Sequence, residues 1–179
     1  IAQYIDDVPI IDSLTAEALL SGIVLDTRNF ILRTGVRTFQ AAAYLRSRAA
    51  DTVEVKKLFS NDMELFKHRN MVVDSTFNYR GCAISVADMI TEDIRLITSQ
   101  AADELLNIDG VKASFVLFEL DGVINISTRS FGEMNVQVVM EKFGGGGHHT
   151  MAAAQIDGGD IDDVVDMLKE EIDKYFDET

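Results

Sequence analysis

Apolar residues along the chain recur first at helical spacing and later alternate between helix-like and strand-like segments. Helical spacing predicts a helix from residue 14 that runs into the apolar segment "GIVLDT" (22–27), a helix over 38–50 and two helices within 51–76. Beyond residue 80 the pattern predicts strand 81–89, helix 92–108, two strands within 109–130, helix 135–143, strand 149–156 and helix 159–176. This order predicts an α/β fold.

Short polar residues mark where most of these helices begin, because their side chains can accept from free backbone N–H groups. The predicted N-caps, in chain order, are Thr15, Thr38, Asp51 or Thr52, Asn61, Asn135 and Asp160. Asp121 and Gly122 separate two β-rich runs, which is the strongest hairpin signal in the chain. The two strands within 109–130 are therefore predicted to pair directly.

Around residues 49–52 the composition changes from an Ala- and Arg-rich stretch to a highly charged one. We interpret this change as the boundary between two parts of the chain. The second part is predicted to be an α/β layer with a hairpin-containing sheet, since strand and helix patterns alternate in it and include a hairpin.

Composition and charge narrow the classes of function. Of the 179 residues, 47% are hydrophobic, so the chain can bury a core. The net charge of -14 repels long polyanions and argues against long DNA or RNA, but a small phosphorylated ligand held by local groups is compatible with it. The single cysteine, Cys82, lies in an apolar strand-like run and is interpreted as a buried core thiol.

No apolar stretch approaches the roughly 20 residues that a membrane-spanning helix needs, and no signal peptide is recognisable. The chain opens with "IAQYIDDVPIID", without an initiating Met. It is therefore expected to be a piece excised from a longer protein.

The stretch "GGGGHHTMAA", residues 144–153, is the most unusual in the chain. One interpretation is a flexible connection from a helix to a strand, although one glycine would serve that purpose. The other is a ligand site, because a glycine-rich turn can aim backbone N–H groups at an anion and a neighbouring histidine can donate to phosphate. The run is neither a Walker loop nor a Rossmann fingerprint.

Two further positions have both a functional and a structural interpretation. Arg129 ends a predicted strand beside Ser130, where it could form a fork for phosphate or an ion pair with an acidic neighbour. Asp26 ends the apolar run 22–27, where a carboxylate could hold Mg²⁺ or Mn²⁺ or could be a helix cap or loop residue.

Together these motifs resemble those of the DHH/DHHA1 phosphoesterase family. "GGGGHHTMAA" resembles the glycine–histidine signature of the DHHA1 domain, and "ISTRS" (126–130) resembles the strand whose Arg contacts substrate. "GIVLDTRNF" (22–30) resembles the last metal-binding motif of the DHH domain. Over nearly all of its length the chain looks like the C-terminal part of membrane-anchored cyclic-di-AMP phosphodiesterases.

The resemblance implies that residues 1–50 are a helical or α/β remnant that ends a DHH catalytic domain and that 51–60 form a linker or helix. It also implies that 61–179 form a DHHA1 substrate-binding domain, a mixed β-sheet with flanking helices. In such enzymes two Mn²⁺ ions activate water for attack on the phosphodiester, and cyclic-di-AMP becomes the linear dinucleotide pApA. Carried over by motif, Asp26 is a metal ligand. The residues that hold substrate phosphate are then Arg129, Gly145, Gly146, Gly147 and His148, with Ser130 and His149 as further contacts.

This sequence departs from the family in two ways. Three residues separate His148 from Ala152 where two are usual, and Ala154 stands where a glycine is usual. The chain also has no DHH triplet, so the other metal ligands are expected upstream of residue 1. The chain alone is then expected neither to bind the metal pair nor to hydrolyse anything, so that no catalytic residue is assigned within it.

Two other functions stay open: a DHH-family exonuclease or oligonucleotide phosphodiesterase, and a non-catalytic nucleotide-binding or dimerisation module. The resemblance implies a cyclic dinucleotide as partner and leaves room for a homodimer. It also implies a parent protein at the cytoplasmic face of the membrane, held there by upstream segments, with the present residues as a soluble piece.

Overall fold

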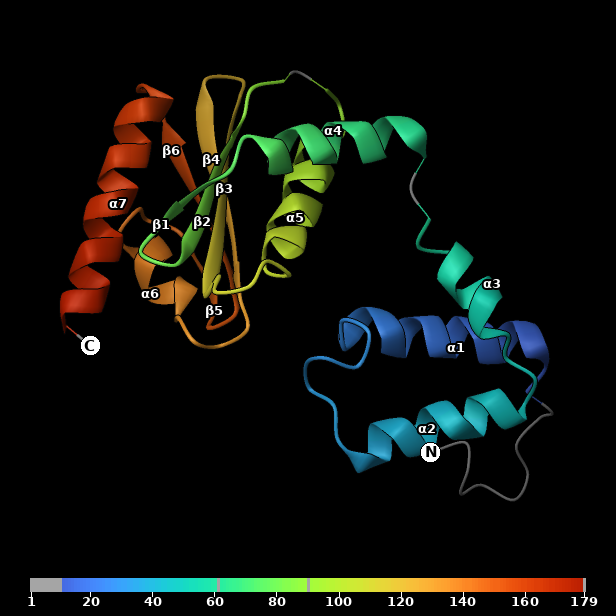
Figure 1. Ribbon diagram of the computed structural model, residues 1–179. Coiled ribbons are helices and arrows are strands. Elements are labelled where there is room, and N and C mark those ends of the chain that lie inside the picture. Colours follow the sequence, from blue (N-terminus) through green and yellow to red (C-terminus); the bar gives the residue numbers. More distant parts are fainter. Residues whose placement is uncertain (1–10, 61, 90, 179) are drawn as a thin grey trace. The chain divides into compact units, whose positions relative to one another are not determined.

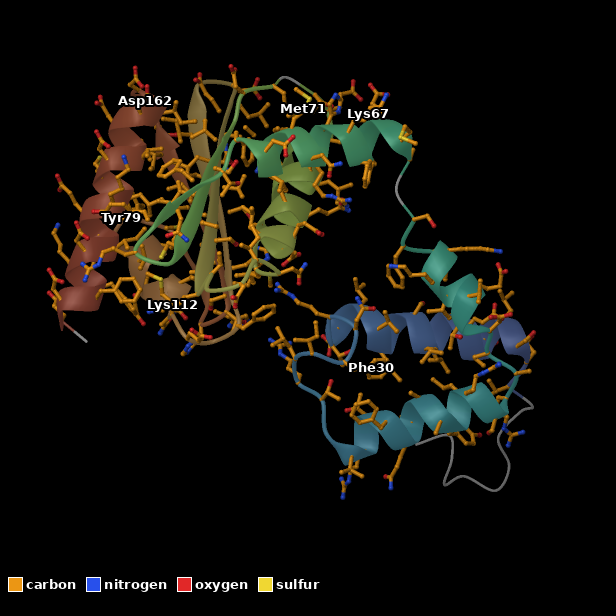
Figure 2. All side chains as sticks on the ribbon, viewed as in Figure 1. Phe30, Lys67, Met71, Tyr79, Lys112 and Asp162 are labelled. Atoms are coloured by element: carbon orange, nitrogen blue, oxygen red, sulfur yellow. The ribbon has the colours of Figure 1, made fainter. Side chains whose placement is uncertain are left out.

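The computed structural model describes residues 11–60, 62–89 and 91–178, and it divides into two compact units after residue 61. The described part of the first unit contains helices α1 (Ser13–Asp26), α2 (Val36–Ser47) and α3 (Thr52–Lys57) (Figure 1). These helices enclose a small apolar core of Ala16, Leu20, Leu45, Ala50 and Val55. Figure 2 labels Phe30, which follows α1 and stacks on Phe39 of α2 with ring centroids 5.3 Å apart.

The N-cap residues of α1 and α2 lie three residues before Thr15 and Thr38, the threonines predicted as caps. Thr15 is inside α1, and its N–H donates to the side chain of the true cap, Asp12, at 2.8 Å. Thr38 is inside α2, and its hydroxyl accepts from the N–H of the cap Gly35 at 3.3 Å. Both threonines thus occupy the inner position of a capping interaction rather than the outer one.

The next two helix starts depend on aspartates. Asp51 caps α3 by accepting from the N–H of Val53 at 2.8 Å, which confirms one of the two alternatives. Helix α4 is capped by Asp62, which accepts from the N–H of Leu65 at 2.8 Å. The predicted cap Asn61 lies outside the described residues.

The second unit contains a six-stranded sheet and four helices among its described residues. Its elements are α4 (Met63–Asp74), β1 (Phe77–Tyr79), β2 (Cys82–Ala87), α5 (Ile94–Leu105), β3 (Ala113–Leu120), β4 (Val123–Ser130), α6 (Val136–Glu141), β5 (Gly146–His148), β6 (Met151–Asp157) and α7 (Ile161–Glu178). The strand order is β1-β2-β3-β4-β6-β5, with β2 and β3 parallel and the other neighbours antiparallel. The predicted α/β fold with a mixed sheet and flanking helices is confirmed.

Helices cover the two faces of the sheet unequally (Figure 1). On one face, α6 and α7 pack on β2, β3, β4 and β6 through residues such as Phe115, Ile126 and Leu168. On the other face, α4 and α5 pack mainly on β2 and β3 through residues such as Val116 and Phe118. The predicted hairpin at Asp121 and Gly122 joins β3 to β4 and is confirmed. Both residues adopt the positive φ that a two-residue hairpin turn needs.

Two more predicted caps and the cysteine are as expected. Asn135 accepts from the N–H of Gln137 at the start of α6, and Asp160 accepts from the N–H of Asp162 at the start of α7. Cys82 is fully buried beneath α6 and α7, and this burial raises the pKa of its thiol to about 12. The thiol is thus a protonated part of the core.

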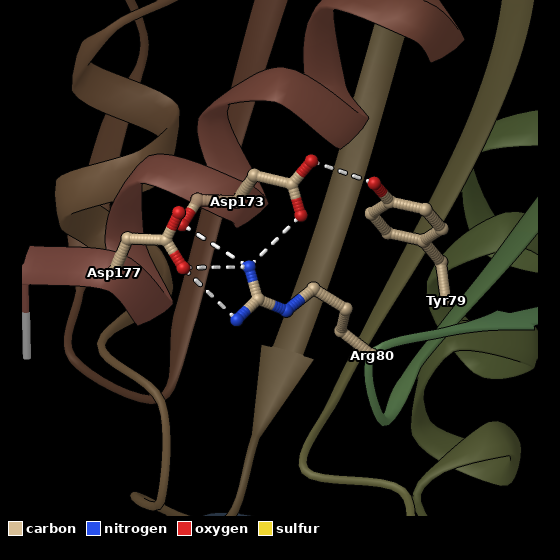
Figure 3. A network of polar contacts seen from close by, with 4 residues as sticks. All are labelled: Tyr79, Arg80, Asp173 and Asp177. Atoms are coloured by element: carbon tan, nitrogen blue, oxygen red, sulfur yellow. Dashed lines mark hydrogen bonds and ion pairs between the residues drawn. The ribbon is translucent and has the colours of Figure 1, made fainter.

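A polar network fastens the C-terminal half of α7 to the turn after β1 (Figure 3). Arg80 donates to Asp173 at 3.0 Å and to Asp177 at 3.0 and 3.1 Å, while the Tyr79 hydroxyl donates to Asp173 at 2.7 Å. The Phe176 ring lies 5.3 Å from the Arg80 guanidinium and 5.0 Å from the Lys112 ammonium. Two cations and two carboxylates thus hold α7 in place at this sheet edge.

The network predicts a pH dependence of stability. Hydrogen bonds from Tyr79 and Arg80 hold the pKa of Asp173 below its ordinary value of 3.8. The stabilisation is therefore present above pH 3.8 and is lost as the pH falls through the lower folded-state pKa. Asp173→Asn removes this acid dependence, which urea unfolding measured from pH 2 to pH 7 would show as a flatter curve.

The matched control is Asp166→Asn on the same helix, since Asp166 pairs only with Lys169, at 2.9 Å, among its described neighbours. This variant should keep the acid dependence of the wild type. Equal flattening in both variants would show that the general charge of α7, and not this network, sets the dependence.

Candidate functional site on the open face of the sheet

The sheet face that carries α5 is left open over β6 and β5 and covered only in part over β4, and a cleft of about 660 Å³ lies there. Its volume is within the range usual for small-molecule sites. Strand β4 and strand β6 form its floor, α5 contributes one side, and the start of the glycine run contributes another. The lining residues are Arg95, Thr98, Phe118, Asn125, Ile126, Ser127, Gly144, Gly145, Ala153, Ala154, Gln155 and Asp157.

The strand register arranges the side chains of this face in rows that cross β4, β6 and β5. One row is basic and runs Arg129, Met151, His148. The next is small and runs Ser127, Ala153, Gly146, and the third holds the amides Asn125 and Gln155. Because residues directly opposite one another share a face, these side chains all belong to the open side of the sheet.

Arg129 is buried and fixes α5 to β4. Its side chain is 9% exposed, and its Nε donates to Asp103 at 3.1 Å. Its Nη2 donates to Ser99 Oγ at 2.6 Å, and its Nη1 donates to Ser127 Oγ at 3.3 Å and to the Thr128 carbonyl at 3.0 Å. The guanidinium thus joins β4 to two successive turns of α5, and its charge is buried between this strand and this helix.

Arg95 lies on the same face of α5 as Ser99 and Asp103 and lines the cleft. It lies four residues before Ser99 and eight before Asp103, which places all three on one helix face. Its side chain is exposed, lines the cleft and has no ion-pair partner among the described residues. Arg95 is therefore the basic group that this cleft offers to a ligand directly.

His148 ends the basic row on the edge strand β5. Its side chain is exposed, and its imidazole makes no hydrogen bond to another residue of the described ranges. In the register it lies opposite Met151, which in turn lies opposite Arg129. An imidazole in this position is free to donate to an anion.

The first two glycines of the run use their backbone N–H groups to end helix α6. The N–H groups of Gly144 and Gly145 donate to the carbonyls of Glu141 and Met140 and so end α6, which leaves neither for an anion. Gly146 and Gly147 then belong to strand β5, whereas the pattern had predicted a turn there.

Close approach of the glycine run to β6 explains two of these glycines. A Cβ on Gly145 would clash with the Ala153 carbonyl oxygen and lie 2.6 Å from Ala154 Cβ. On Gly147, whose φ is +152°, it would clash with the Met151 carbonyl oxygen and lie 2.5 Å from Ala152 Cα. A Cβ on Gly146 would meet nothing within 4 Å, so within β5 this glycine leaves bare surface.

Ser130 and His149 lie apart from the open face. Ser130 is fully buried on the opposite side of the sheet, and its hydroxyl donates to the Met134 carbonyl at 2.7 Å. His149 is in the turn between β5 and β6, where its ring nitrogen Nε2 bonds the Gly132 carbonyl at 3.0 Å. The two residues therefore shape the β4 and β5 loops, and neither adjoins Arg95.

Asp26 is the last residue of helix α1, because the apolar run 22–27 is helical and not a strand. Its carboxylate is 72% exposed and lies 3.8 Å from Arg33 Nη1. The following residues Arg28, Asn29 and Phe30 all have positive φ, in a turn held by Thr27, whose hydroxyl accepts from the Phe30 N–H at 2.9 Å. The described residues contain no group of three or more His, Cys, Asp or Glu side chains suited to hold a metal.

Sequence reasoning missed Arg95, Asn125, Ser127 and Gln155. A signal for two of them was present, since Asn125, Ser127 and Arg129 alternate with the apolar or buried residues of a strand that was correctly predicted. Such an alternation in a central strand indicates one open face. Arg95 and Gln155 carry no comparable signal, because exposed polar residues are common on helices and strands.

The sequence model of the DHHA1 domain family matches residues 87–174, which include α5, the cleft and most of α7. The chain carries a DHHA1 domain. It is 46% identical over 176 residues to the cyclic-di-AMP phosphodiesterase PdeA of Listeria monocytogenes. The aligned region covers 97% of this chain and 27% of that protein. It is 42% identical over 170 residues to the cyclic-di-AMP phosphodiesterase GdpP of Bacillus subtilis, with coverages of 93% and 26%.

The chain thus spans about a quarter of the length of these curated relatives. Among solved structures, an exopolyphosphatase-related protein from Bacteroides fragilis superposes with a TM-score of 0.80 and 21% identity, over 92% of this chain and 51% of that one. At this identity the likeness shows a shared fold. None of the described helices has the length and apolar character needed to cross a bilayer.

Substituting the glycines one at a time separates their roles in the DHHA1 domain. Gly145→Ala and Gly147→Ala should each lower the free energy of unfolding by about 1–3 kcal/mol, because the added methyl overpacks β6. Gly146→Ala should change it by less than about 1 kcal/mol, since its methyl enters open space. Urea unfolding followed by circular dichroism gives all three values, and equal losses at the three positions would contradict this assignment.

Proposed function

We propose that this chain is the substrate-holding part of a longer phosphodiesterase that hydrolyses cyclic-di-AMP to pApA. The observation that carries the proposal is 42–46% identity, over more than nine-tenths of this chain, to two relatives that are named cyclic-di-AMP phosphodiesterases. The open face of the DHHA1 domain supports it, because an exposed cleft with basic and amide groups suits a nucleotide.

In this proposal the phosphate of the substrate lies over the basic and small rows. His148 donates to it directly, since its side chain is exposed and makes no hydrogen bond within the described residues. Arg95, which lines the cleft together with Phe118 and Asn125, adds an exposed positive charge. Gly146 lets the phosphate approach β5, as a side chain there would occupy the open face. Arg129 acts indirectly, by fixing α5 to β4 and so positioning Arg95.

The metal part of the proposal involves Asp26. In the bound state two Mn²⁺ ions would activate water and neutralise charge on the attacked phosphodiester. An exposed carboxylate is a suitable ligand type, so Asp26 fits as one ligand, but the described residues supply no complete set around it. We therefore propose that the other ligands lie upstream in the longer protein and that the 179 residues alone are catalytically incomplete.

His148→Ala tests the phosphate contact. Loss of a charge-assisted hydrogen bond should weaken cyclic-di-AMP binding by about 10- to 150-fold, the equivalent of about 1.5–3 kcal/mol. Isothermal titration calorimetry of the chain with cyclic-di-AMP measures this, and the effect should shrink as salt is raised.

The matched control is His68→Ala, which removes a histidine of α4 and should leave affinity unchanged. Unchanged affinity in His148→Ala would remove His148 from the site. The same preparation incubated with Mn²⁺ and cyclic-di-AMP should release no pApA, and release at the rate of the longer protein would refute the incompleteness of the chain.

A further inference from the structure

The amide row of the cleft has no role in phosphate binding. Asn125 of β4 and Gln155 of β6 lie directly opposite one another, and both line the cleft. The basic row lies four residues away along β4, which at about 3.3 Å per residue is roughly 13 Å. This is about the length of one extended mononucleotide, so a ligand whose phosphate lies at the basic row brings its base to the amides.

A short relay of hydrogen bonds fixes the orientation of these amides. The backbone carbonyl of Val123 can only accept, so Asn125 presents its Nδ2 to it, at 3.0 Å. Asn125 Oδ1 then faces the other way and accepts from Gln155 Nε2 at 2.9 Å. The orientation of Gln155 is thus set by the backbone of β4, through Asn125.

The relay leaves specific groups of Gln155 for a ligand. Its Oε1 and its second Nε2–H make no hydrogen bond with other residues of the described ranges, and its side chain is exposed on the open face. Asn125 is 4% exposed and so acts as a support rather than a contact. Phe118, the neighbour of Asn125 on β3, adds an apolar wall to the same end of the cleft.

We infer that Gln155, oriented by Asn125, reads the edge of an adenine base and so selects adenine over guanine. This inference rests on the proposed nucleotide site. Adenine presents its N6 amino donor beside a ring acceptor, which a glutamine amide matches with one acceptor and one donor. The edge in question is the one that carries N7: there adenine presents N6–H and N7, whereas guanine presents O6 and N7, both acceptors, so Oε1 of Gln155 would face an acceptor and one pairing would be lost.

Binding of AMP, GMP and ribose 5-phosphate to the 179-residue chain tests the inference, with affinities and positions taken from amide NMR shifts. The wild type should favour AMP over GMP by about 5- to 150-fold, as expected for one good bidentate pair. Gln155→Met keeps length and exposure but removes both polar groups. It should bring the AMP to GMP ratio close to one and leave the affinity for ribose 5-phosphate unchanged.

The control is Gln137→Met, which removes a glutamine of α6 on the other side of the sheet and should keep the wild-type ratio. Asn125→Ala removes the relay while Gln155 stays, and should lower the ratio without abolishing binding. A wild-type ratio near one, or a Gln155→Met ratio equal to that of the wild type, would overturn the inference.

His148→Ala separates the two proposals. It should weaken AMP and GMP equally, because it removes a phosphate contact and no base contact. If His148→Ala weakens both nucleotides while Gln155→Met leaves their ratio unchanged, the nucleotide site stands and the base reading fails. If no nucleotide binds to the wild type, both proposals fail.

Discussion

Strand β4 lies between β3 and β6, and the two-residue alternation of its side chains determines what the surrounding elements can do. Ile124, Ile126 and Thr128 point to the core beneath α6 and α7, so Asn125, Ser127 and Arg129 must point to the face of α5. Since α5 covers β3 more than β4, this polar half of the strand lies partly open. The cleft exists because α5 packs over β3 and leaves part of β4 and all of β6 without a covering helix on this face.

Arg129 shows how the alternation creates a constraint that the structure then satisfies. Its position in a central strand buries a guanidinium, and burial of a charge is costly unless the charge is paired and hydrogen-bonded. Asp103 and Ser99 supply those partners from α5. The same contacts orient α5, so that Arg95, one turn earlier, lies at the cleft. A residue that looks like a ligand contact from its motif is thus also the support of its neighbour.

Much of the fold could be predicted from the sequence, and the exceptions have local causes. The hairpin at Asp121 and Gly122 and the caps Asn135 and Asp160 depend on a few adjacent residues, and each is confirmed. The apolar run 22–27 fits a buried strand and a helix end equally well, so only its packing in the first unit makes it helical. Whether a polar residue such as Ser130 or Arg95 faces the cleft depends on strand register and on which helix covers which strand, neither of which the sequence shows.

The charge of the cleft limits how a ligand can be held there. Among the described residues that line it, Arg95 is the one cation and Asp157 the one anion, while the charge of Arg129 is already balanced by Asp103. In a chain of net charge -14, phosphate contacts alone would give weak and unselective binding. Neutral groups must then supply the rest of the binding energy, and neutral hydrogen-bonding groups distinguish bases where point charges do not. An amide pair at the far end of a weakly charged cleft is therefore where selectivity between purines is most expected.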